Sequence, residues 1–390
     1  MNRLFFLIAA LLMVSACGPR YPEHSVIVNS TDALVETAAG TVCGYIEDGI
    51  YTFKGIDYAT ARRFEAPQDV EPWEGVQTAL YYGNQCHQSP RVTWGDDCEA
   101  FLYEWDDGVQ SDNCLNLNVW TPGINDGKKR PVMVWLHGGG YAMGASSELP
   151  FYDGANLAKK GVVLVSINHR LNFLGYLDLS EYGEKYKYSG VAGVMDMVKA
   201  LEWVNKNIAG FGGDPDNVTI FGQSGGGGKV NILMGTPSAK GLFHRGIIES
   251  GSMTGLMAPE TCRAMARSIV NKLGLNEKTI DRIQEIPYSE LLAAATDAVI
   301  PLVEESLAVV APGHAGGLVA LVTVIKGCLH AFPGLHVLRR LEAPGSGIVD
   351  ALEGVDAVLD VAADGTGGGL DEGISAIDNH GMLRILGAAG

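Results

Sequence analysis

Positive charge is scarce in this sequence. Lysine and arginine total 28 residues against 45 aspartates and glutamates, which gives a formal net charge of −17, and no basic cluster interrupts that balance. A phosphate backbone would be repelled by such a chain rather than neutralised. The composition therefore argues against a nucleic-acid partner.

Long apolar runs are also lacking. Residues 4–14 are apolar and follow Arg3, but the run is too short to cross a bilayer and has the layout of a secretory signal. The small residues before Cys17 resemble a bacterial lipobox, which predicts a signal peptide of residues 1–16 and a lipid on Cys17. The alternative is an ordinary signal peptide cut near Ala16, with Cys17 unmodified. We expect an exported protein of the bacterial cell envelope, on the periplasmic side or at the outer membrane, or a secreted one under the alternative.

Metal-ligand spacing is absent among the acids of the irregular stretch 60–110, so these acids are expected on a solvated face and no metal or cofactor is predicted. A stretch of this length without regular structure is usually functional or held by cross-links. Export permits disulfides, but six cysteines allow about 15 complete pairings, so the sequence alone does not choose among them. The six beyond Cys17 are Cys43, Cys86, Cys98, Cys114, Cys262 and Cys328.

The middle of the chain alternates apolar runs with helix-like segments. Short runs from about residue 25 to residue 58 are typical of an antiparallel start to a sheet. Continuous apolar runs predict strands, and apolar residues at helical spacing predict helices. The predicted strands cover residues 116–120, 131–136, 162–167, 218–221 and 246–250, and the predicted helices cover residues 156–160, 194–208, 260–273 and 289–298. This alternation predicts an α/β fold with a mostly parallel sheet that has helices on both faces.

A sharp turn from strand to helix is predicted at residues 222–226, Gly-Gln-Ser-Gly-Gly. The G-x-S-x-G pattern holds the serine oxygen clear of the backbone, and the glycines on either side let neighbouring segments approach closely. A bare pattern of this kind is also compatible with an incidental serine in a glycine-rich turn. Here a strand precedes it and a helix-capable segment follows, so Ser224 is the predicted nucleophile.

A second glycine-rich block, His137 and the three glycines after it, follows the predicted strand 131–136. Acyl transfer places negative charge on a carbonyl oxygen, and donors aimed at that oxygen each lower the barrier by roughly 3–4 kcal/mol. Backbone N–H groups of glycines are donors that no side chain obstructs. The N–H of Gly225, directly after the serine, is expected to be a third donor.

These blocks resemble the type-B carboxylesterase and cholinesterase family of α/β hydrolases. The resemblance runs from about residue 25 to residue 298 and is carried by residues 53–59, 112–120, 134–140, 168–171, 211–219, 222–226, 241–245 and 250–251. It implies an α/β-hydrolase fold, Ser224 as nucleophile, and Gly139, Gly140 and Gly225 as the oxyanion donors. It also implies a disulfide between Cys86 and Cys114, which would hold the irregular stretch beside the site.

Two positions depart from the family. Gln223 stands where the family usually has a glutamate, which removes a negative charge without removing the nucleophile. The family's acid and histidine follow the serine at long distances, and they remain unassigned here. Asp371-Glu372 and His380 match short pieces of those motifs, but they lie much closer together than in the family, and His314, His330 and His336 have no supporting context.

The composition changes after about residue 300. From residue 311 onward the chain has one aromatic residue (Phe332), one lysine, one asparagine and no glutamine, while glycine, alanine, valine and leucine dominate. We therefore expect a hydrolase-like region over residues 17–300 that is incomplete at its C-terminus, and an atypical tail over residues 301–390. A frameshift or interruption, a disordered segment and a separate domain are the alternatives for that tail.

The predicted function is that of an exported serine hydrolase acting on small carboxylic esters through an acyl-enzyme. The competing hypothesis is an inactive or truncated hydrolase relative that serves as a surface binding module. Ser224 and the glycine donors favour the enzyme, whereas the unassigned acid and histidine favour the binding module.

The lipobox hypothesis predicts that Cys17→Ser releases the protein from the membrane fraction, because the lipid is its only expected anchor. Fractionation of cells expressing the wild type and the variant measures this directly. A wild type found wholly in the unbound fraction, with an unmodified Cys17, would contradict the hypothesis.

Overall fold

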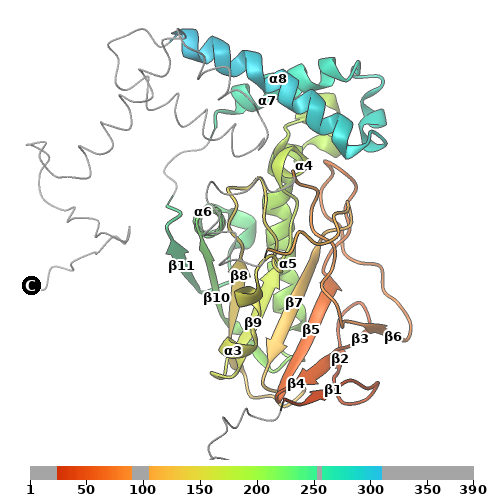
Figure 1. Cartoon of the computed structure of the whole chain (residues 1–390), viewed down its shortest axis with the longest axis vertical. Coiled ribbons are helices and arrows are strands. Elements are labelled where there is room, and N and C mark those ends of the chain that lie inside the picture. Colours follow the sequence, from red (N-terminus) through yellow and green to blue (C-terminus); the bar gives the residue numbers. More distant parts are fainter. Residues whose placement is uncertain (1–23, 90–104, 253–256, 310–390) are drawn as a thin grey trace, which may run out of the picture.

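The computed structural model describes residues 24–89, 105–252 and 257–309, and within them a large sheet forms the centre of the fold (Figure 1). Its eight strands lie in the order β1 (Val26–Ile27), β4 (Tyr45–Glu47), β5 (Ile50–Asp57), β7 (Asn116–Thr121), β9 (Val163–Ile167), β8 (Arg130–Leu136), β10 (Gly213–Gln223) and β11 (Arg245–Glu249). A smaller sheet holds β2 (Leu34–Glu36), β3 (Thr41–Cys43) and β6 (Val76–Thr78).

The large sheet is mixed. The pairings from β1 through β4, β5 and β7 to β9 are antiparallel, and those from β9 through β8 and β10 to β11 are parallel. The antiparallel start predicted from the sequence is confirmed, and the α/β class with it. The expectation of a mostly parallel sheet holds only for the half that carries the glycine-rich blocks. In the stretch expected to be irregular, residues 76–78 form β6.

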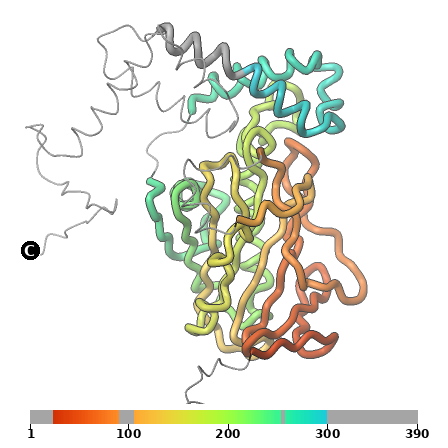
Figure 2. The backbone as a smooth tube through the Cα atoms, in the orientation of Figure 1, coloured from red at the N-terminus to blue at the C-terminus, as the bar shows by residue number. Residues whose placement is uncertain are grey.

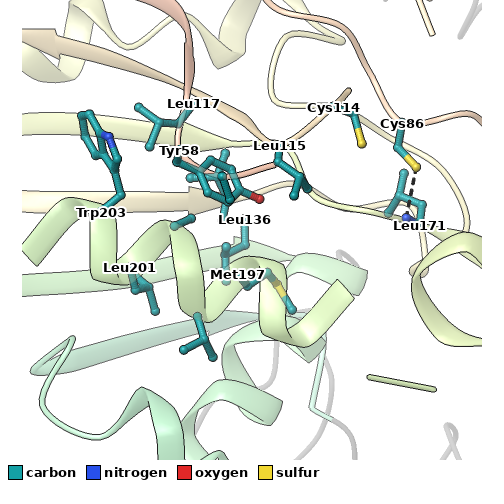
Figure 3. Close-up of a cluster of buried hydrophobic side chains, with 14 of the residues drawn as sticks. Tyr58, Cys86, Cys114, Leu115, Leu117, Leu136, Leu171, Met197, Leu201 and Trp203 are labelled. Atoms are coloured by element: carbon teal, nitrogen blue, oxygen red, sulfur yellow. Dashed lines mark hydrogen bonds between the residues drawn. The ribbon is translucent and has the colours of Figure 1, made fainter. Parts of the chain in front are cut away.

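Helices cover both faces of this sheet. One face packs against α5 (Ala192–Asn207) and α6 (Gly225–Gly235), and the other packs against the short α3 (Ala155–Ala158). Alternate residues of β9 serve the two faces, since Val163, Val165 and Ile167 join the main core while Leu164 packs with Trp120 and Ala158. Figure 3 shows Leu136 of β8 and Met197 of α5, which both belong to the main core.

The remaining helices cap the end of the sheet at which β8, β10 and β11 terminate (Figures 1 and 2). Tyr288 at the start of α8 stacks on His87, with ring centroids 4.9 Å apart, and on Phe173, with centroids 5.4 Å apart. The α-helices of this end are α4 (Asn172–Tyr176), α7 (Pro259–Lys272) and α8 (Tyr288–Val309). The 3-10 helices within the described residues are η1 (Pro150–Tyr152), η2 (Ser180–Tyr182), η3 (Glu184–Tyr186), η4 (Ser189–Val191), η5 (Pro237–Ala239) and η6 (Ile280–Gln284). Among the described residues, no helix is long and apolar enough to cross a membrane.

A buried ion pair joins the end of β9 to α5. The Arg170 guanidinium donates to both carboxylate oxygens of Asp196, at 2.6 and 2.8 Å, and also to the carbonyl of Glu65 at 2.7 Å. Burial opposes charge on Arg170, but the attraction of Asp196 outweighs it and raises the arginine pKa above its usual range. Arg170 therefore stays charged inside the core, and its hydrogen bonds tie three segments together.

Replacing Asp196 with Asn should lower the free energy of unfolding by about 3–5 kcal/mol, because it leaves the buried Arg170 charge uncompensated. Urea unfolding followed by circular dichroism measures the change. Glu184→Gln is the matched control, since it breaks an exposed pair with Lys187 and should cost under about 1 kcal/mol. Equal losses in the two variants would contradict the prediction.

Candidate functional site

Strand register brings three separate sequence blocks to one edge of the sheet. Leu136 at the end of β8 pairs with Ile167 at the end of β9 on one side and with Gly222 near the end of β10 on the other. These pairings are parallel, so the segments after all three strands leave the sheet at the same edge. β9 and β10 follow β8 in the chain but lie on opposite sides of it, which makes β8 a switch point of the kind where α/β proteins bind ligands.

Ser224 lies between β10 and α6 in a strained backbone conformation. Its φ is 54° and its ψ is −122°, a region that a residue with a side chain occupies at a cost of about 1–3 kcal/mol. Two backbone hydrogen bonds hold it there, one from the Ser224 N–H to the carbonyl of Glu249 at 2.8 Å and one from the Gly228 N–H to the Ser224 carbonyl at 3.0 Å. Ser224 is exposed at this edge of the sheet.

The glycines on either side of Ser224 are required by the closeness of β8. A Cβ atom at Gly222 would lie 2.5 Å from the carbonyl oxygen of Leu136, and one at Gly226 would lie 2.1 Å from the same oxygen. Neither distance is sterically allowed, so no other residue fits at either position without moving the strand. The close approach predicted from the G-x-S-x-G pattern is therefore present.

The loop after β8 bends with three successive positive φ angles, 85° at Gly139, 60° at Gly140 and 66° at Tyr141. It lies against the serine turn, since a Cβ atom at Gly225 would be 2.5 Å from the Gly140 nitrogen. The three candidate donors, Gly139, Gly140 and Gly225, thus belong to two backbone segments in direct contact beside Ser224.

Polar groups from two other segments hold the far half of this loop. The Gln88 side chain accepts from the Gly144 N–H at 2.8 Å and donates to the Gly144 carbonyl at 3.1 Å. Asn172 donates its backbone N–H to the Tyr141 carbonyl at 2.8 Å. Residues 141–144 are therefore held from outside the loop by hydrogen bonds.

Lys229, on α6, holds the near half of the loop and was missed by the sequence reasoning. It is fully buried, and its ammonium donates to the carbonyls of His137 at 2.8 Å and Gly138 at 3.4 Å. Burial lowers its pKa to about 7, although Glu148 favours the charged form. The sequence signal that could have found it is that Lys229 is the one charged residue in the segment of residues 225–235.

Two buried histidines lie beside this lysine. The rings of His137 and His169 stack with centroids 5.0 Å apart, and the Nδ1 atom of His137 lies 3.0 Å from the Gly138 carbonyl. Burial and then the Lys229 charge lower the pKa of His169 well below its usual value. His169 is therefore a neutral packing group at neutral pH.

Comparison with known proteins agrees with this arrangement. The sequence model of the carboxylesterase family matches residues 31–326. The chain belongs to the carboxylesterase family. It is 41% identical to the para-nitrobenzyl esterase of Bacillus subtilis over 270 residues, which cover 68% of this chain and 53% of that protein. It is 37% identical to the liver carboxylesterase of Sus scrofa, over 63% of this chain and 45% of that enzyme.

Solved structures give the same family relationship. An esterase from Clostridium hathewayi that can hydrolyse aliphatic aromatic polyesters has 44% sequence identity and a TM-score of 0.67, over 73% of this chain and 56% of that one. The carboxylesterase of Geobacillus stearothermophilus has 41% identity and a TM-score of 0.61, over 68% of this chain and 53% of that one. This carboxylesterase-family chain therefore spans about half the length of the relatives it matches.

The disulfide implied by the family resemblance is not formed. Cys86 and Cys114 are free thiols in the structure, as are Cys43 and Cys262. Figure 3 shows Cys86 beside Cys114, with its sulfur directed at the Leu171 N–H, which lies 3.2 Å away. The Cys86 thiol and burial raise the pKa of Cys114 well above its usual value, so the Cys114 sulfur stays protonated.

Several predicted residues lie outside the described part of the chain. They are the signal segment 1–16, Cys17, Cys98, Cys328, the histidines His314, His330, His336 and His380, the acids Asp371 and Glu372, and the tail from residue 310 onward. Within the described residues, no group of three or more histidines, cysteines or carboxylates could hold a metal ion.

The Lys229 pKa predicts a pH-dependent stability. Because the folded-state pKa is about 7 and that of an exposed lysine is 10.5, the unfolded chain binds more protons between these values and stability rises with pH across this window. From pH 7 to about pH 9, the wild type should gain about 2 kcal/mol relative to Lys229→Met. Urea unfolding of both proteins at the two pH values measures it.

Lys199→Met is the matched control for this experiment. The pKa of Lys199 is raised by Asp69 and Glu202 against the opposing effect of burial, so Lys199 stays charged in both states throughout the window. The difference between the wild type and Lys199→Met should not vary with pH. If the stability difference between the wild type and Lys229→Met is also independent of pH, the lowered pKa of Lys229 is wrong.

Proposed function

We propose that this chain carries the nucleophile and the oxyanion donors of a serine carboxylester hydrolase. The observation that supports the proposal is the contact between the strained Ser224 turn and the loop of Gly139 and Gly140. A nucleophile and several unobstructed N–H donors meet there at the edge of the sheet where α/β proteins bind ligands. The family membership of the chain points to the same chemistry.

In the proposed mechanism, the Ser224 oxygen attacks the carbonyl carbon of an ester while a base takes the hydroxyl proton. The carbonyl oxygen becomes an anion that accepts hydrogen bonds from Gly139, Gly140 and Gly225. Collapse of this intermediate breaks the bond to the alcohol, which leaves with the proton, and an acyl group remains on Ser224. Water then adds to the acyl carbon in the same way and releases the acid. The base and its acid partner are not assigned to residues.

The proposed substrates are small carboxylic esters, in keeping with relatives such as the para-nitrobenzyl esterase of Bacillus subtilis. The fixed backbone donors recognise the carbonyl oxygen common to all esters, so they set the reaction type rather than the choice of alcohol. We propose further that the protein acts in the cell envelope, exported by the signal segment and anchored through Cys17.

Ser224→Ala should lower the hydrolysis of p-nitrophenyl acetate by the full chain by about 10³-fold or more, because the acyl-enzyme can no longer form. Release of p-nitrophenol at 400 nm measures the rate. Ser238→Ala, an exposed serine in η5, is the matched control and should leave the rate unchanged. Equal rates for the wild type and Ser224→Ala would end the enzyme hypothesis and favour a surface binding module.

A further inference from the structure

Lys229 connects the helix that follows the candidate nucleophile to the loop that carries the donors. It lies on α6, in the turn after the one that begins at Ser224, and its ammonium reaches across to β8 and the loop after it. A buried ammonium is costly unless several acceptors surround it. Here two of its acceptors are carbonyl oxygens of the loop, those of His137 and Gly138.

The hydrogen bond from Lys229 to the Gly138 carbonyl determines the direction of the next N–H group, that of Gly139. In a trans peptide the C=O and the following N–H point in opposite directions. Holding the Gly138 carbonyl on the Lys229 side therefore directs the Gly139 N–H to the other side. The Gly138–Gly139 peptide has no side chain on either residue, so rotation of this peptide meets little steric resistance within the loop.

The other polar groups around the loop act at different positions. Gln88 and Asn172 bond to residues 141–144, and the N–H groups of Ala142 and Met143 bond to the Gly139 carbonyl. At the Gly138 carbonyl, the Nδ1 atom of the adjacent His137 lies 3.0 Å away and the Lys229 ammonium donates at 3.4 Å. Lys229 thus ties the peptide that carries the first donor to α6, from outside the loop.

We propose that Lys229 is a positioning residue that fixes the Gly139 N–H toward the oxyanion and links the loop to the nucleophile helix. This inference rests on the proposed function for its catalytic consequence. The structural part of the inference, that Lys229 restrains the loop, rests only on its hydrogen bonds to the carbonyls of His137 and Gly138.

Burial sets the direction of the Lys229 pKa shift, and the charged and titratable groups that face the ammonium modify it. Glu148 attracts the ammonium, the Tyr141 ring lies 5.7 Å away, and His169 and His137 pack nearby. The neutral amine is a weaker donor than the ammonium and brings no positive charge near the developing anion. The catalytic benefit of Lys229 should therefore be larger at about pH 6 than at about pH 9.

The experiment compares Lys229→Met with the wild type in the full chain, with Lys199→Met as the matched control. Hydrolysis of p-nitrophenyl acetate should show kcat lowered by about 10- to 100-fold and KM within about twofold, because the lost interaction acts on the transition state. The ratio of wild-type to Lys229→Met kcat should fall as pH rises from about 6 to about 9. Lys199→Met should match the wild type throughout.

Hydrogen exchange followed by mass spectrometry tests the same inference without activity. Amides of residues 137–143 should exchange about tenfold faster in Lys229→Met, while those of β8 keep their wild-type rates. If Lys229→Met does not fold, Lys229→Gln replaces it. The wild type alone also provides the test, since loop exchange corrected for its intrinsic rate should be faster at about pH 9 than at about pH 6.

The outcomes separate this inference from the proposed function. Unchanged loop exchange, or an unchanged kcat in a folded Lys229→Met variant of an active enzyme, overturns the positioning role. If Ser224→Ala matches the wild type, the proposed function fails, and loop exchange alone decides whether Lys229 restrains the loop. If Lys229→Met lowers kcat by the same factor at all pH values, the contribution assigned to the charged form of Lys229 is overturned.

Discussion

The carbonyl oxygen of Leu136 sets the geometry of the whole site. It lies so close to the turn after β10 that a Cβ atom would collide with it at both Gly222 and Gly226. This contact exists because β8 and β10 are adjacent parallel strands whose register pairs Leu136 with Gly222. The same register decides that the loop after β8 and the serine turn leave the sheet side by side. A change in the pairing of these two strands would separate the two halves of the site.

Glycines leave the backbone N–H groups of the site open to a substrate, but they provide no side chains that could hold the loop in place. Three successive residues of the loop have positive φ, and the serine turn has another such residue. Groups outside the loop supply the restraint: the side chains of Gln88 and Lys229 and the backbone N–H of Asn172 each bond to loop backbone groups. Of these three, Lys229 is the costly one, because an ammonium loses its hydration when it is buried. A neutral amide such as that of Gln88 restrains a loop at lower cost, which indicates that the lysine at this position contributes through its charge as well.

Much of the fold could be predicted from local pattern. The central strands were found from their continuous apolar runs and α5 from apolar residues at helical spacing, and the serine turn was found because G-x-S-x-G has a steric meaning of its own. The extent of the antiparallel half of the sheet could not be found in this way, since the direction of a strand depends on its neighbours in space. For the same reason the burial of Lys229 escaped the analysis: its acceptors, the carbonyls of His137 and Gly138, lie far from it in the chain. The Cys86–Cys114 bridge was carried over from family resemblance, and proximity of the two thiols is all that the fold itself provides.

The charges of the chain act on the site at two different ranges. The net charge of −17 is a property of the whole chain, and the influence of exposed carboxylates is screened by salt within about 10 Å. Lys229 is buried beneath the loop, where screening is weak and its field reaches the donors directly. In the proposed mechanism, an acidic protein can therefore still favour an anion at Gly139 and Gly140, because the Lys229 ammonium lies close to the loop while exposed surface charges are screened. The net charge therefore says less about the site than the buried Lys229 does.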